Sequence, residues 1–338
     1  MAHGQRRQEG RGKGQIDLTN LIDLFIASKE VEGRSKKTTD WYRANLKVFA
    51  AFMGKQGPVT VQDLTVSNAR AFVAELQSRT TRYSNHSSRP AKTGGLSAFT
   101  INGYIRTVKA FGAWLHEEGF ASQHPFERLK APKLPDTVIE ILSEEEIQRL
   151  FNATNPNTAL GARNQLILLL LLDTGIRASE LCGLKVEHTY LNESYIKVRG
   201  KGNKERIVPF GATTKKAIMR YLNAYRSEPA SDDVRTLILT MDGFSLEYEG
   251  LAQIIRRMAV GTDIPRLHIH LFRHTFAVRY LMNGGDVMTL RLILGHTTLD
   301  VTQMYMHLAD AHIQVQHSKF SPVDRLELSG RKRRGHSS

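Results

Sequence analysis

The sequence predicts a mainly α-helical protein of two domains with one small β-hairpin or sheet. A length of 338 residues suggests two domains of roughly 150 residues each. Apolar residues recur at helical spacing through most of the chain, and 41% of all residues are hydrophobic, which is enough to build buried cores. In one stretch apolar and basic residues alternate on either side of a glycine-rich turn, as is typical of a hairpin.

The first half of the chain is predicted to be a helical bundle over residues 16–128. Residues 1–15 are rich in Gly, Arg and Gln and are expected to form a disordered basic arm. The first helix follows from apolar residues at i, i+3, i+4 and i+7 spacing, namely Leu18, Leu21, Ile22 and Phe25. Three further amphipathic helices are expected at about 38–54, 62–78 and 97–118. The segment Arg79–Gly95 between the last two has the polar, glycine-containing composition of an exposed loop.

The second domain is expected to span residues 138–325, after a linker at 129–137 whose two prolines disfavour a helix. Ser143 and Glu146 fit a capping box that opens a helix. A buried helix at 165–172 is expected to end near Gly175, and Tyr195–Arg199 and Arg206–Phe210 are expected to form the hairpin around Gly200–Asn203. The remaining expected elements are helices at about 213–226, 248–259, 270–283, 286–294 and 299–314 and a basic tail at 326–338.

The charge of the chain favours a polyanionic partner. The formal net charge is +14, an excess that attracts nucleic acid more than a small neutral substrate. Residues 1–136 hold 21 basic and 12 acidic residues, and the remainder holds 26 and 21. Because both halves are basic, the composition fits a two-domain clamp on DNA better than a single basic tail. Candidate DNA contacts are Arg82, Arg89, Lys92, Arg106 and Lys204, although a plain surface insertion explains the basic loop equally well.

Other classes are disfavoured by composition. The single cysteine, Cys182, cannot form an intramolecular disulfide, and the basic N-terminus lacks the apolar stretch of a signal peptide. The longest apolar run, Leu166–Leu172, has seven residues, far fewer than the ~20 that cross a bilayer. We therefore expect no membrane association and a cytoplasmic, nucleoid-associated location.

Basic groups and one phenol dominate the candidate reactive residues of the second domain. They are Arg177, Lys201, His270, Arg273, His296 and Tyr305. A site with arginines and histidines but without clustered carboxylates suits a negatively charged transition state and suits Mg²⁺ poorly. The residue types therefore predict phosphoryl transfer without a metal or other cofactor. Each residue alone also has an ordinary structural explanation, such as a surface ion pair between Arg177 and Glu180; the combination is the informative signal.

A metal site is the alternative for one histidine cluster. His268, His270 and His274 lie close in sequence, but no nearby cysteine or carboxylate completes a familiar zinc spacing. Histidines beside an arginine on a helix more often bind phosphate or form core hydrogen bonds. We therefore expect no metal.

Five motifs in a fixed order resemble those of the tyrosine recombinases, also called phage-type integrases. The motifs are T-G-I-R-A-S-E-L at 174–181, G-K-G-N-K-E-R at 200–206, H-L-F-R-H at 270–274, L-G-H at 294–296, and Tyr305 nine residues later. The resemblance covers about residues 138–325. It extends more loosely to Tyr104–Leu115, which is similar to the last helix of the family's SAM-like core-binding domain. Phe272 stands where the family usually has leucine, a packing change that we do not expect to affect the chemistry.

The resemblance implies a site-specific recombinase or integrase that cleaves and rejoins DNA through a 3′-phosphotyrosyl intermediate. Arg177 and Arg273 would hold the non-bridging oxygens of the scissile phosphate, and His270 and His296 would donate to it or orient it. Lys201 would protonate the leaving 5′ oxygen, with Lys204 as the fallback, and Glu180 would be a supporting acid. Tyr305 would be the nucleophile. The partners implied are double-stranded DNA with inverted half-sites and a homo-tetramer that exchanges C-terminal helices.

Two other classes of protein compete with this interpretation. A non-catalytic DNA-binding protein of the same fold is disfavoured because all six candidate catalytic residues are present. A type IB topoisomerase shares the nucleophile chemistry, but the size and two-domain plan fit a recombinase better. Because about 15 residues precede the first helix, the chain resembles the shorter Xer-like or mobile-element members. The sequence leaves open chromosome-dimer resolution, mobile-element integration or excision, the target DNA sequence and any accessory protein.

Overall fold

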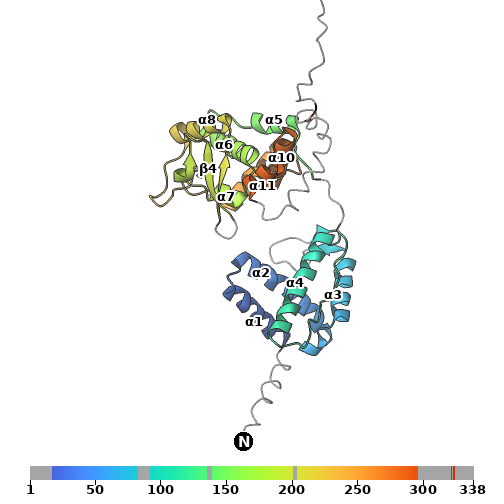
Figure 1. The fold of residues 1–338 in the computed structure, drawn as a ribbon. Coiled ribbons are helices and arrows are strands. Elements are labelled where there is room, and N and C mark those ends of the chain that lie inside the picture. Colours follow the sequence, from blue (N-terminus) through green and yellow to red (C-terminus); the bar gives the residue numbers. More distant parts are fainter. Residues whose placement is uncertain are drawn as a thin grey trace, which may run out of the picture. The chain divides into compact units, whose positions relative to one another are not determined.

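The computed structural model describes residues 17–82, 92–134, 139–200 and 204–295, together with Ser321 and Val323. The chain divides into two compact units, residues 1–137 and 138–338 (Figure 1). Both are built mainly from helices, and the second also contains a small sheet. The predicted fold class is therefore confirmed.

Four helices build the first unit: α1 (Leu18–Val31), α2 (Lys36–Met53), α3 (Val66–Ser78) and α4 (Ala98–Glu117). A side-chain oxygen at each N-cap accepts a hydrogen bond from the first turn, which fixes where the helix begins; the caps are Asp17, Ser35, Thr65 and Ser97. The predicted start of the third helix at residue 62 is wrong. Residues Val61–Asp63 form a separate 3₁₀ turn, and α3 begins only after the cap at Thr65.

Aromatic side chains fill the core of this unit. The phenyl rings of Phe49 and Phe72 meet edge-on with centroids 5.1 Å apart, and Phe126 contacts Phe49 from the segment after α4. Leu129 is also buried in this core. The first residue of the expected linker is thus part of the helical unit's core.

The basic segment between α3 and α4 is not wholly irregular. Strand β1 (Thr81–Arg82) pairs antiparallel with β2 (Lys92–Thr93), so that Arg82 lies opposite Lys92 in the register. The intervening residues, including Arg89, lie outside the described part of the chain. The sequence analysis expected an exposed loop here, and at the two ends of the segment backbone pairing gives that loop a hairpin base.

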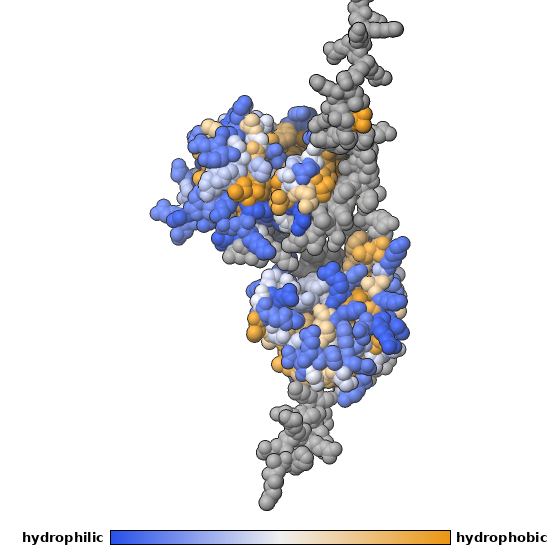
Figure 2. Space-filling view, in the orientation of Figure 1, coloured by the Kyte–Doolittle hydropathy of each residue, from blue (hydrophilic) through white to orange (hydrophobic). Residues whose placement is uncertain are grey.

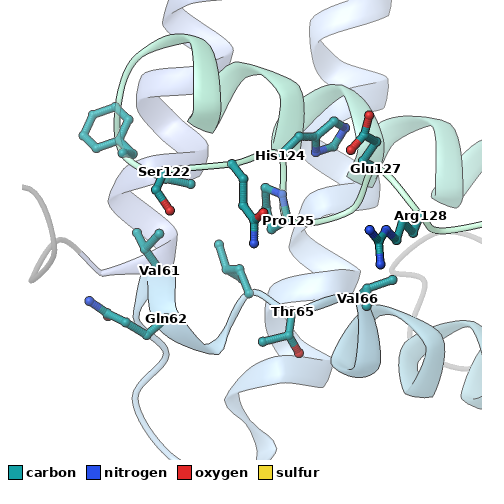
Figure 3. A pocket seen from close by; sticks show the side chains of 13 residues that line it. Val61, Gln62, Thr65, Val66, Ser122, His124, Pro125, Glu127 and Arg128 are labelled. Atoms are coloured by element: carbon teal, nitrogen blue, oxygen red, sulfur yellow. The ribbon is translucent and has the colours of Figure 1, made fainter.

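The first unit also contains a cavity of about 560 Å³. Figure 3 shows it between the residues that precede α3, among them Val61, Gln62 and Thr65, and the segment after α4, with Ser122 and Pro125. Among the residues that the structure describes, no candidate catalytic residue lines it.

The second unit has seven helices among its described residues and one antiparallel sheet in the order β3-β4-β5. The helices are α5 (Glu144–Asn152), α6 (Ala159–Thr174), α7 (Ala178–Cys182), α8 (Ala212–Arg220), α9 (Tyr248–Gly261), α10 (Ile269–Met282) and α11 (Val287–Leu294). The strands are β3 (Thr189–Tyr190), β4 (Tyr195–Arg199) and β5 (Glu205–Pro209). A 3₁₀ turn at Val186–His188 precedes β3, and a π turn at Tyr221–Tyr225 follows α8. In the sheet, Ile196 pairs with Val208, as a hairpin around residues 200–203 requires.

Helix α6 is the centre of this unit. Its apolar run is buried on several sides and contacts both α8 and α10 (Figure 1). The helix begins at Ala159 rather than near residue 165, because Thr158 caps it by accepting a hydrogen bond from the Gly161 N–H. The sequence interpretation also missed β3 and α7, which are too short to show a period. The helix expected at 299–314 lies outside the described residues.

Hydrophilic residues cover most of the face shown in Figure 2, with apolar patches between them. Within the described ranges, no helix combines the length and the hydropathy needed to cross a membrane.

Candidate active site

The ends of two helices meet in the second unit, and both end on a glycine with left-handed backbone. Gly175 caps α6 with φ 60°, and Gly295 caps α11 with φ 62°. A Cβ atom added to Gly175 would lie 2.4 Å from the Phe276 ring and 2.9 Å from Leu294. Glycine is therefore required at Gly175 both for the backbone conformation and for the close approach of α10 and α11.

Arg177 lies two residues after Gly175 and is the N-cap residue of α7. Its backbone N–H donates a 2.8 Å hydrogen bond to Glu180 Oε2, and its Nη1 donates to Glu180 Oε1 at 3.0 Å. Its Nη2 donates to the carbonyl of Gly295 at 3.3 Å. The side chain is 32% exposed, so the guanidinium is held by the two helix ends and still reaches solvent.

Arg273 joins the same two helix ends from α10. It is only 6% exposed. Its Nη1 donates to the carbonyl of Gly175 and its Nη2 donates to the carbonyl of Leu294, each at 2.7 Å. The structure thus brings Arg177 and Arg273 to one junction, although 96 positions separate them in the sequence.

Glu180 lies beneath these arginines and is shared with a residue that the sequence interpretation did not select. Arg206, on β5, donates to both Glu180 oxygens at 2.6 and 2.9 Å, and its Nε donates to the carbonyl of Ile293 at 2.7 Å. Burial acts to raise the pKa of Glu180, but the hydrogen bonds from Arg206 and the Arg177 backbone outweigh it and hold that pKa below its usual value. Arg206 ends the G-K-G-N-K-E-R motif, which was the one available signal for it.

His270 is exposed on the first turn of α10, and His274 is half-buried one turn later. Desolvation lowers the pKa of His270, and the positive charges of His268, Arg273 and Arg177 lower it further. Desolvation and the neighbouring positive charges also lower the pKa of His274. His270 therefore lies within the electrostatic field of both arginines and favours its neutral form. In the described part of the chain, no three His, Cys, Asp or Glu side chains gather as metal ligands.

Lys204 is exposed just before β5, and its carbonyl accepts a 2.8 Å hydrogen bond from the Gly200 N–H, which closes the hairpin. In the first unit, Arg106 is exposed on α4. Lys201, His296 and Tyr305, together with Arg89, lie outside the described residues.

The fold has two mainly helical units, and in the second unit two arginines meet beside a buried carboxylate. This arrangement fits an enzyme that transfers DNA strands. Comparisons with known proteins agree. The phage integrase family model matches residues 140–312. The tyrosine recombinase XerC of Oceanobacillus iheyensis is 31% identical over 313 residues, which cover 91% of this chain and 97% of that protein. The tyrosine recombinase XerD of Listeria monocytogenes is 28% identical, over 90% and 99% of the two chains.

Solved structures share the fold at lower identity. The Tn1549 transposon integrase in complex with transposon right end DNA superposes with a TM-score of 0.68 at 18% identity, covering 90% of this chain and 100% of that one. A lambda integrase dimer bound to a core site gives a TM-score of 0.64 at 16% identity, covering 85% and 97%.

The protein is therefore an enzyme that cleaves and rejoins DNA, as the motif order predicted. It belongs to the phage integrase family of tyrosine recombinases and acts as a site-specific DNA recombinase.

Proposed function

We propose that this recombinase cleaves each strand by transferring the scissile phosphate to Tyr305, without a metal ion or ATP. The convergence of Arg177 and Arg273 at the junction of α6 and α11 carries the proposal. Two guanidinium groups can hold the non-bridging oxygens and stabilise the charge that develops on them. His270 and His296 donate to the phosphate or orient it, and Glu180 supports Arg177.

In the proposed reaction, the Tyr305 oxygen attacks phosphorus and the bond to the 5′ oxygen breaks. Lys201 gives that oxygen a proton, so the products are a 3′-phosphotyrosyl bond and a free 5′ hydroxyl. The 5′ hydroxyl of a second strand reverses the step, because the covalent bond preserves the phosphodiester energy. A phenol with a pKa of ~10 is a poor nucleophile at neutral pH. The neighbouring cations therefore have to favour the loss of its proton to water as the bond to phosphorus forms.

The proposed substrate is double-stranded DNA with inverted half-sites. Residues 16–129 are assigned as the core-binding domain and residues 138–325 as the catalytic domain, which close on the duplex as a clamp; residues 130–137 are the linker, because Leu129 is buried in the core of the helical unit. The relatives in solved structures include a XerH recombinase bound to its difH substrate. Contacts with phosphates are proposed for Arg82, Arg89, Lys92, Arg106 and Lys204. The exposure of Arg106 and Lys204 supports the proposal for these two residues.

The proposed active assembly is a homo-tetramer on two DNA sites, in which each copy lends its C-terminal segment to a neighbour. The segment carries apolar residues at Leu308, Phe320 and Leu326. Support comes from apolar side chains that the second unit leaves exposed: Met288 and Leu292 of α11 are 58% and 72% exposed, and Val323 is 60% exposed. Truncation after Gln316 should preserve binding to one half-site and abolish cooperative binding to two. Unchanged cooperativity in a gel-shift titration would mean that the segment packs on its own domain.

The covalent intermediate tests the proposed reaction directly. Tyr305→Phe keeps the ring and removes the attacking oxygen, so we expect unchanged DNA affinity and complete loss of the covalent adduct. The measurement is a protein–DNA band that survives denaturation, formed on a suicide substrate nicked near the cleavage site. An adduct in the variant would eliminate Tyr305 as the nucleophile. Wild-type cleavage should persist in EDTA, and activity that only a divalent metal restores would eliminate the metal-free mechanism.

A further inference from the structure

Two positively charged arginines pair with one buried carboxylate, that of Glu180. Its side chain is 1% exposed, yet two arginines share it. Arg177 contributes a side-chain and a backbone donor, and Arg206 contributes two side-chain donors at 2.6 and 2.9 Å. One negative and two positive charges leave this cluster with a net charge of about +1.

We propose that Arg206 is a positioning residue that neutralises Glu180, so that Arg177 keeps its positive charge for the scissile phosphate. The inference rests on the proposed function, in which Arg177 holds that phosphate. If Arg206 were absent, Glu180 would pair with Arg177 alone. Because the carboxylate is buried, this pairing would be strong and would cancel much of the charge that the transition state needs.

A second contact lets Arg206 act on the geometry of the site as well. Its Nε donates to the carbonyl of Ile293 at 2.7 Å, and a Cβ atom added to Gly295 would lie 3.0 Å from the Arg206 Cδ. Arg206 therefore packs directly against the end of α11, where Arg177 also hydrogen-bonds to Gly295.

The Arg206 side chain is 13% exposed, and the three nitrogens of its guanidinium donate to Glu180 and Ile293. These contacts hold Arg206 against Glu180 and the end of α11, so we assign it a role that acts through Arg177. A lysine would preserve the charge but has neither the planar fork nor the Nε donor. Substitution by lysine consequently separates the charge effect from the geometric one.

The test compares single-turnover cleavage of a suicide half-site substrate by the full-length wild type and three variants. We expect Arg206→Gln to cleave about 10²-fold more slowly than wild type, the scale of a small displacement of a catalytic group. Arg206→Lys should lie between the two. Glu180→Gln/Arg206→Gln removes both partners of the charge pair and should cleave at least ~10-fold faster than Arg206→Gln, because no unpaired carboxylate remains to capture Arg177.

Arg266 provides a matched control. It donates to both oxygens of Glu146 at 2.5 and 2.8 Å and to the carbonyl of Ile141 at 3.0 Å, a set of contacts similar to that of Arg206, and its Nε also pairs with Glu140 at 3.1 Å. It contacts none of the proposed catalytic side chains through these bonds. Arg266→Gln should therefore lower the melting temperature but leave the cleavage rate within about twofold of wild type, with half-site affinity unchanged.

Two outcomes would overturn the inference: a folded Arg206→Gln protein that cleaves at the wild-type rate, or a double variant no faster than Arg206→Gln. If Arg206→Gln does not fold, Glu180→Gln is compared with Glu180→Gln/Arg206→Gln. If these two variants cleave at rates within about threefold of each other, the result supports the role of Arg206 in neutralising Glu180. A tenfold or larger difference between their rates contradicts that role. Failure of the wild type to form an adduct would instead refute the proposed function, so the two failures are distinguishable.

Discussion

Arg273 Nη1 donates a 2.7 Å hydrogen bond to the carbonyl of Gly175, the glycine that ends α6. The other arm of the guanidinium holds Leu294, the last residue of α11. Arg273 thus holds together the two helix ends that position Arg177, which lies two residues after Gly175 in the sequence. Arg177, by contrast, is partly exposed and lies on the surface of this junction. The two arginines should therefore respond differently to substitution.

We expect Arg177→Ala and Arg273→Ala each to lower DNA cleavage by roughly 10²-fold or more, the usual scale for losing a preorganised transition-state donor. Half-site binding should fall far less, since each residue is one phosphate contact among many. Arg273→Ala should also lower the free energy of unfolding by about 3 kcal/mol, because it leaves two buried carbonyls without their charged donor. Single-turnover cleavage and thermal unfolding separate the two effects. A normal cleavage rate in either variant would show that its arginine is only structural.

Lys201→Ala should be rescued by a substrate in which sulfur replaces the bridging 5′ oxygen. A thiolate leaves without a proton from a general acid, so the variant should cleave the sulfur substrate nearly as well as wild type. The same comparison on Lys204→Ala decides between the two lysines. Equal defects of Lys201→Ala on both substrates would mean that Lys201 only positions the DNA.

Gly175→Ala should destabilise the second unit and reduce cleavage. The left-handed φ of 60° costs an alanine about 1–2 kcal/mol, and its Cβ would crowd the Phe276 ring and Leu294. Gly33→Ala is the control: its φ is 75°, but nothing lies within 4 Å of the added Cβ. Thermal unfolding should show the larger loss for Gly175→Ala. Equal losses for the two variants would mean that the helix ends move apart without cost.

Stability should fall as the pH drops below about 6.5, the ordinary pKa of histidine. Desolvation lowers the pKa of both His270 and His274 in the folded protein. In this range the unfolded chain therefore binds more protons than the folded one, so stability is complete above pH 6.5 and is lost as the pH falls toward the lowered values. Unfolding of wild type and His274→Asn at pH 7.5 and 5.5 measures the contribution. A drop of the same size in both proteins would assign the pH dependence to other groups.

The sequence by itself determined the fold class, most helix positions and the order of the recombinase motifs. These follow from local patterns: apolar periodicity sets the helices, and Ser143 with Glu146 forms its capping box within four residues. The elements that were missed, β3 and α7, have two and five residues and gain their stability from packing rather than from a pattern of their own.

Tertiary structure alone decided how the motif residues support one another. The sequence presented Arg206 as the end of a hairpin motif and Arg273 as a phosphate ligand. Only the fold places Arg206 on Glu180, 26 positions away, and Arg273 on the Gly175 carbonyl, 98 positions away. The physical reason is that an arginine's partners depend on which buried acceptors the packed helices bring within about 3 Å of it, and a one-dimensional motif does not contain that information.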